Sequence, residues 1–157
     1  MADRDAINAP ARTTRFEVEL ELDGGAVQGW KTIELPSVST EEVSYREGNE
    51  QVAYDHPLWG RHEYDNLTMT RGAKTGETML WDWRQKVIDG NLDEARKSIA
   101  VTIFDVANSA SLLRYEFEGA WPVNYSPPTL DASAVGGESA LAEEEIEIAY
   151  EKYERSA

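Results

Sequence analysis

The chain has 157 residues, a length that suits one domain with its own hydrophobic core. It carries 30 acidic against 15 basic residues, a formal net charge of −15, which argues against tight binding to the phosphate backbone of nucleic acids. The absence of cysteine excludes disulfide bonds, zinc–thiolate sites and thiol nucleophiles.

Residues 1–14 are expected to form a flexible N-terminal arm, and residues 15–157 a single domain. The first residues contain no apolar segment of the kind found in secretory signals. No apolar run in the chain approaches the ~18 residues that a membrane-spanning helix needs. We therefore expect a protein without a membrane anchor that is made in the cytoplasm.

Strict alternation predicts a strand over residues 16–22, in which apolar residues alternate with glutamates. The following Asp23-Gly24-Gly25 is a hairpin turn signal. A second strand is expected over residues 27–35, with a kink near Gly29 and an end at Pro36.

A third strand is expected over residues 42–46, and a further alternating strand over residues 63–71. Between them lies a long polar segment, residues 47–61, which carries an apolar Pro57-Leu58-Trp59 group. We interpret this segment as a loop with an apolar tip.

Helical periodicity appears over residues 76–90, where Leu80, Trp83 and Val87 recur on one face. Thr75 is placed to cap the start of this helix and Gly90 to follow its end. Large aromatic residues at helical spacing usually pack in a core, so we expect the same of Trp81 and Trp83.

Two more β-rich runs follow, residues 98–106 and 112–118, and the second is expected to end within residues 119–122. The tail, residues 142–155, fits either a strand with Ile146, Ile148 and Tyr150 on one face or an amphipathic helix. The order of the elements predicts a mainly β fold: a small antiparallel barrel or sandwich with one flanking α-helix and a long inter-strand loop.

No motif supports an enzyme. His62-Glu63 begins like a zinc-protease motif, but Asn66 stands where the second histidine is needed. The segment 72–76 does not match a phosphate-binding loop. His56, His62 and the nearby acidic residues show no diagnostic ligand spacing, so no metal site and no cofactor are predicted.

Several segments in order resemble the tail tube proteins of contractile phage tails and contractile injection systems. They are RFEVEL from Arg15, VSYREGNE, LWGRHEYDNLTMTRG, LWDWRQKVIDG, GAWPVNYSPPTLDA and the closing EEIEIAYEKYER. The resemblance covers nearly the whole chain from Arg15. It implies the fold of the tube protein of type VI secretion, and it implies that residues 142–152 form a strand.

The resemblance also implies hexameric rings that stack into a tube inside a contractile sheath. The implied partners are other copies of the chain, the sheath protein, the baseplate or tube initiator, and the tube terminator. DNA or protein cargo would pass through the lumen without tight binding. The implied location is the virion tail or an injection particle.

In the family, the loop corresponding to residues 47–61 reaches adjacent subunits and the neighbouring ring. The ring and stacking interface is therefore expected at Glu47, Asn49, His56, Pro57, Leu58, Trp59 and Arg61. The alternative is that Trp59 packs back on its own barrel. Alternating strands can also turn carboxylates toward the lumen; the candidates are Glu17, Glu19, Glu21, Glu143, Glu145 and Glu147.

The acidic charge has two interpretations: adaptation to a salty cytoplasm, or a surface past which nucleic acid or acidic cargo slides. Two alternative functions remain open. The chain could be a specialised relative at the end of the tube, an initiator or cap, or a free-standing β-barrel binding module.

Overall fold

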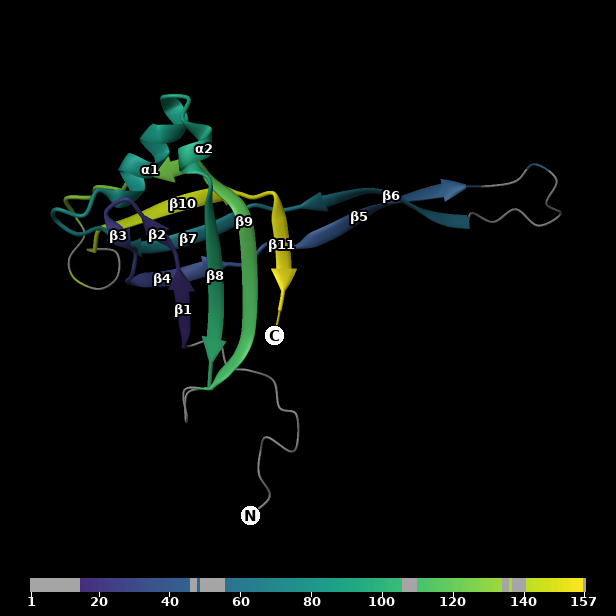
Figure 1. The fold of residues 1–157 in the computed structure, drawn as a ribbon, viewed down its shortest axis with the longest axis horizontal. Coiled ribbons are helices and arrows are strands. Elements are labelled where there is room, and N and C mark those ends of the chain that lie inside the picture. Colours follow the sequence, from purple (N-terminus) through teal and green to yellow (C-terminus); the bar gives the residue numbers. More distant parts are fainter. Residues whose placement is uncertain are drawn as a thin grey trace, which may run out of the picture.

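The computed structural model describes residues 15–45, 48, 56–105, 110–133, 136 and 141–156. The expected N-terminal arm, Glu47 and Asn49 lie outside these residues. The fold is mainly β and its sheets are antiparallel (Figure 1). The elements are β1 (Phe16–Glu19), β2 (Glu21–Leu22), β3 (Gly25–Ala26), β4 (Trp30–Glu34), β5 (Val38–Tyr45), β6 (His56–Tyr64), β7 (Leu67–Gly72), α1 (Met79–Ile88), α2 (Leu92–Ala95), β8 (Lys97–Phe104), β9 (Ser111–Ser126), β10 (Glu143–Ala149) and β11 (Lys152–Arg155).

One long strand, β9, joins two half-sheets. Its first part pairs with β8 and β11, and its last part pairs with β10. We call β1, β8, β11 and the first part of β9 the first half-sheet. The second half-sheet consists of β4, β7, β10 and the last part of β9. The strands of the two half-sheets cross (Figure 1), which is the arrangement of an orthogonal sandwich whose corner strand belongs to both layers.

The corner of β9 lies where the sequence analysis expected the strand to end. That expectation is wrong, because β9 continues through residues 119–122 to Ser126. Gly119 has φ +65°, a conformation that favours glycine and turns the strand. Pro122 is tolerated because the register with β10 shifts at this point, between Glu147 and Ile148.

The hydrophobic core lies between the half-sheets and beneath α1. Its members come from both layers: Val18, Leu20, Leu22, Val27, Leu67, Met69, Leu80, Trp83, Ala95, Ile99, Val101, Phe117, Ala120, Ile146 and Ile148. The sheet path runs β1-β8-β9-β10-β7-β4, so the barrel is not closed between β1 and β4. The sandwich form of the prediction is confirmed.

The tail forms a strand, β10, as the family resemblance implied, and not the alternative amphipathic helix. Glu144, Ile146 and Ile148 of β10 are buried, whereas Glu145 is exposed and Glu147 is half-buried, a period of two. The strand is interrupted at Tyr150 and Glu151. As a result, β10 belongs to the second half-sheet and β11 to the first.

Two other expected strands are also divided. Of residues 27–35 only β4, Trp30–Glu34, is a strand; it begins after Gly29, whose φ of +84° confirms the kink expected there. Residues 63–71 do not form one strand, because β6 ends at Tyr64 and β7 begins at Leu67 in a different sheet.

The helix α1 is shorter than expected, and its N-cap is Thr78 rather than Thr75. Gly90 occupies the position after the Asp89 C-cap with φ +85°, as predicted. Trp83 is buried, and its indole donates a hydrogen bond to the Ala95 carbonyl at 2.5 Å. Trp81 is exposed and packs edge-on against Tyr125, so the core prediction holds for Trp83 alone.

Candidate functional site

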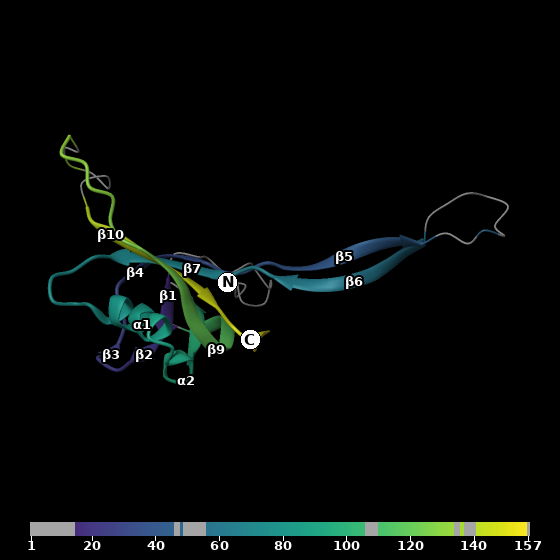
Figure 2. The same cartoon turned by 90° about the horizontal axis from the view of Figure 1, so that it is seen from above.

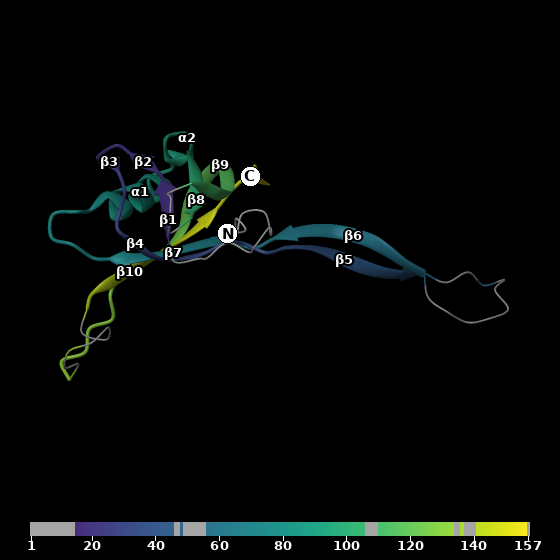
Figure 3. The same ribbon diagram turned by 90° about the horizontal axis from the view of Figure 1, so that it is seen from below.

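A two-stranded ribbon projects from the second half-sheet. We call it the arm; it consists of β5 and β6, which pair antiparallel. The arm continues the β4–β7 pair, because β5 follows β4 and β6 precedes β7 in the chain. At the junction, the Asp65 amide donates a hydrogen bond to the Ser37 carbonyl at 3.0 Å. Figures 2 and 3 show the arm lying clear of both half-sheets.

The arm corrects the expectation of a loop with an apolar tip. Pro57, Leu58 and Trp59 lie within β6, where they pair with Ser44, Val43 and Glu42. A proline fits here because each strand of a two-stranded ribbon has one edge without a ladder partner. The apolar group therefore lies along the paired part of the ribbon.

A bulge interrupts the arm. His62 lies opposite Thr40, and Trp59 lies opposite Glu42. Between these two pairs β6 has two residues and β5 has one, so β6 carries one extra residue. A Cβ at Gly60 would meet Glu41 and Val43 at 3.1 Å, which explains the glycine. The bulge shifts which face of the arm the residues of β6 occupy.

The arm exposes large apolar side chains on both faces. Trp59 is 84% exposed and Leu58 51%. The other exposed apolar residues of the arm are Val38, Val43, Tyr45 and Tyr64. By register, Leu58 shares a face with Val43 and Tyr45, while Trp59 shares the opposite face with Glu42 and Pro57.

This exposure rules out the alternative in which Trp59 packs on its own barrel. A bare two-stranded hairpin is marginally stable in water. Contiguous exposed apolar side chains mark a surface that binds a partner. The arm is therefore the candidate interaction site of the chain.

The polar residues of the arm form local contacts. His62 Nδ1 lies 2.9 Å from the Thr40 hydroxyl oxygen. Arg61 pairs with Glu63 of its own strand at 3.2 Å. His56 lies opposite Tyr45 in the ladder. Within the described part of the chain, no group of three histidine or acidic residues is arranged to hold a metal ion.

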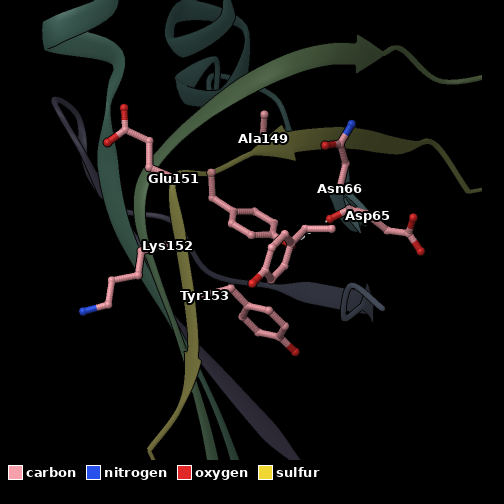
Figure 4. A pocket seen from close by; sticks show the side chains of 8 residues that line it. Asp65, Asn66, Ala149, Glu151, Lys152 and Tyr153 are labelled. Atoms are coloured by element: carbon pink, nitrogen blue, oxygen red, sulfur yellow. Dashed lines mark hydrogen bonds between the residues drawn. The ribbon is translucent and has the colours of Figure 1, made fainter. Parts of the chain in front are cut away.

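Aromatic side chains anchor the base of the arm. Tyr64 contacts Tyr150 edge-on, with ring centroids 6.5 Å apart, and Tyr150 contacts Phe117 and Tyr153. The Tyr150 hydroxyl donates a hydrogen bond to the Asp65 carbonyl at 2.8 Å. Burial, followed by the nearby Tyr153, raises the pKa of Tyr150 to about 12. Figure 4 shows the side chains around the hollow of about 210 Å³ at this place.

This anchor was not predicted from the sequence. Its signal was present in the tail, where Tyr150 and Tyr153 stand three residues apart. Tyr150 lies in the break between β10 and β11, Tyr153 lies in β11, and both rings contact Phe117.

The predicted lumen carboxylates lie on two different surfaces. Glu143, Glu145 and Glu147 occupy the outer face of the second half-sheet, opposite Gly72, Thr70 and Thr68 of β7. Glu143 pairs with Lys31 at 2.5 Å, and Glu147 accepts a hydrogen bond from Asn66 at 2.8 Å.

The β1 carboxylates belong to the first half-sheet, and Glu21 lies in the short β2–β3 hairpin. Glu19 accepts two hydrogen bonds of 3.2 Å from the Arg114 guanidinium. This bonding holds the pKa of Glu19 below its usual value. Glu17 and Glu19 therefore belong to one half-sheet and Glu143, Glu145 and Glu147 to the other, and the two half-sheets cross.

The described helices include none long and apolar enough to cross a membrane. The model of one family, described as T4-like virus tail tube protein gp19, matches residues 12–154. The chain belongs to this family. No curated protein sequence gives a significant match.

Solved structures share the tail tube fold. One is described as the sheath/tube terminator of an extracellular contractile injection system; it is 21% identical, with a TM-score of 0.76 over 95% of this chain and 98% of that one. A chain from the sheath-tube complex of such a system is also 21% identical, with a TM-score of 0.76 over 98% of this chain and 96% of that one. Hcp1 from Flavobacterium johnsoniae is 18% identical, with a TM-score of 0.51 over 88% and 94%.

Tail tube proteins are structural proteins, so the chain is a structural component of a phage tail or injection particle and not an enzyme. Other solved neighbours come from structures described as a baseplate and a tube-terminating cap of the anti-feeding prophage. Because the chain belongs to the tail tube family, we do not retain the alternative of a free-standing binding module.

Proposed function

We propose that the chain is the repeating subunit of an inner tail tube, in which hexameric rings stack into a hollow tube. The single observation that carries the proposal is the arm, which exposes Leu58 and Trp59 away from the body of its own domain. In this function the arm binds adjacent subunits in the same ring and in the next. The apolar side chains that are exposed in one copy are buried by assembly.

The free strand edges support a closed ring. Among the described strands, β1, β4 and β11 each pair on one side only. Unpaired edges favour pairing with another chain, and a closed ring leaves no edge open. A heterologous contact that closes by rotation produces such a ring.

The outer face of the second half-sheet is the stronger candidate for the lumen. Glu145 has no ion pair within the described residues, and its strand neighbours on this face are Thr70 and Ser126. The β1 carboxylates are weaker candidates because Arg114 neutralises Glu19. An acidic, hydroxyl-rich wall repels DNA and acidic proteins, so cargo of either kind slides past without binding.

The remaining partners follow from this function. The sheath protein covers the outside of the tube, and α1 with its adjoining loops is the proposed outer feature. A tube initiator at the baseplate and a tube terminator bind the two ends. Contraction of the sheath then drives the tube through the target envelope.

Negative-stain electron microscopy of the purified protein, at low and high salt beside light scattering for mass, tests the proposal. We expect hexameric rings or tubes, and more of them at high salt, because salt screens repulsion between subunits of charge −15. A protein that stays monomeric at both salt concentrations and does not add to purified baseplates overturns it.

A second candidate function is a specialised relative at the end of the tube. Two similar structures are described as a sheath/tube terminator and as a tube-terminating cap, the latter with a TM-score of 0.73 and 19% identity over 95% and 92% of the two chains. The same micrographs separate the candidates: a terminator forms single rings that do not lengthen, whereas a main tube subunit forms stacks.

A further inference from the structure

The end of the second half-sheet opposite the arm carries a small hollow. We call it the far-end hollow; it has a volume of about 320 Å³. Its lining residues are Lys31, Gly72, Ala73, Lys74, Leu141, Ala142 and Glu143. Lys31 lies near the start of β4 and Gly72 ends β7, whereas the arm leaves from the end of β4 and the start of β7. Figure 3 shows the start of β10 and the arm at opposite ends of the half-sheet.

The far-end hollow combines an apolar surface with an unpaired positive charge. Leu141 is 68% exposed at its rim. The chain has five lysines, and four of them form ion pairs: Lys31 with Glu143, Lys86 and Lys97 with Asp23, and Lys152 with Glu154. Lys74 is exposed and has no ion pair among the described residues. In so acidic a chain, a lysine without a carboxylate partner is the exception.

The arm presents the complementary chemistry. Glu42 lies directly opposite Trp59, and by register both project from the same face. Neither Glu41 nor Glu42 has an ion pair or hydrogen bond among the described side chains. One face of the arm thus offers an exposed indole beside a free carboxylate, and the far-end hollow offers an exposed leucine beside a free ammonium.

We propose that the arm of one copy docks on the far-end hollow of a second copy, with Trp59 against Leu141 and Glu42 toward Lys74. This inference rests on the proposed function and names the receiving surface for the arm. A copy cannot occupy its own hollow, because the arm and the hollow lie at opposite ends of the β4–β7 ribbon. The contact is heterologous and leaves each pair with one free arm and one free hollow, so that it repeats along a stack.

Because the chain has no cysteine, a cysteine introduced by mutation is the only thiol with which a maleimide cross-linker can react. Copies carrying Ser44→Cys, on the Trp59 face of the arm, are mixed with copies carrying Ala142→Cys, next to Leu141, and treated with a short bis-maleimide. Trp59 and Leu141 are both retained in this test. We expect a mixed cross-linked dimer in high yield. The matched control replaces the second partner with Ile88→Cys, on the exposed side of α1, where Ile88 is 61% exposed. Equal yields from the two mixtures overturn the inference.

A charge swap provides the second measurement. Lys74→Glu and Glu42→Lys should each weaken self-association by up to about fivefold per contact, the upper end for an exposed ion pair. The double variant should recover most of that loss. If arm variants abolish assembly but Lys74→Glu and the cross-link show no preference, the arm function stands and this receiving surface is wrong. If arm variants assemble normally, both proposals fail.

Discussion

The guanidinium of Arg71 and the carboxylate of Glu144 lie against each other inside the sandwich, with 3.7 Å between Nε and Oε1 and side chains 2% and 8% exposed. They are directly opposite on β7 and β10. Glu144 also accepts a hydrogen bond of 2.8 Å from the Tyr125 hydroxyl, and Arg71 pairs with Glu77 before α1. This buried group of charges therefore connects three strands and the segment that leads to the helix.

Arg71→Met should lower the free energy of unfolding by about 3–5 kcal/mol, because it leaves the Glu144 carboxylate buried without its cation. Urea unfolding measures the change. Replacing both residues, as Arg71→Met with Glu144→Leu, should restore part of the loss, since no uncompensated charge is then buried. A double variant no more stable than the single one would contradict this account.

Gly119→Ala should destabilise the corner of β9 by about 1–2 kcal/mol, the cost of a left-handed conformation for a residue with a Cβ. Its φ is +65°, and a Cβ there would meet the Glu151 side chain at 2.9 Å. Gly72→Ala is the matched control, because a Cβ at Gly72 meets nothing within 4 Å. Equal changes in the urea midpoint of the two variants would show that the corner does not depend on this glycine.

Stability should fall as the pH rises from about 10 to about 12, the interval between the ordinary pKa of tyrosine and that of Tyr150. The folded state holds the Tyr150 proton more tightly than the unfolded state, so the stabilisation is complete below the lower value and lost through the upper one. Tyr125, whose pKa burial and Glu144 raise to about 12, adds to the same loss.

Tyr150→Phe should reduce that alkaline loss, as measured by unfolding midpoints across the pH range. At neutral pH it should cost about 1 kcal/mol for the hydrogen bond to Asp65. Tyr45→Phe, on the exposed arm, should leave the alkaline loss as it is in the parent protein. An unchanged loss in Tyr150→Phe would remove Tyr150 as its source.

Local patterns were sufficient to predict the half-buried strands. The alternation in residues 16–22 and around Ile146 and Ile148 predicts strands with one exposed and one buried face. The structure shows the same alternating burial. The corner of β9 was not predictable in this way. A glycine and a proline near each other usually end a strand, and only the bulge opposite Ile148 lets the chain pass through Pro122.

Composition was sufficient to locate the candidate site, but it was predicted to be the tip of a loop and is instead part of a strand. Apolar Leu58 and Trp59 within a polar segment indicated an interaction surface, which fits their exposure on the arm. Their strand conformation depends on pairing with β5, which precedes β6 in the chain, and no local pattern reports such pairing. For the same reason the sequence did not show that Lys74 and Leu141 meet at one hollow.

Replacing Leu58 and Trp59 together by glutamate should leave the domain folded and abolish assembly into tubes. Both side chains are exposed and lie outside the core, so the free energy of unfolding should change by no more than about 0.5 kcal/mol. Assembly should fail because the buried apolar anchors of the contact become charged. Urea unfolding checks the first expectation, and electron microscopy with light scattering checks the second. Ile88→Glu, which changes an exposed apolar residue on α1, should still assemble. Tubes from the arm variant would show that the arm does not join the subunits.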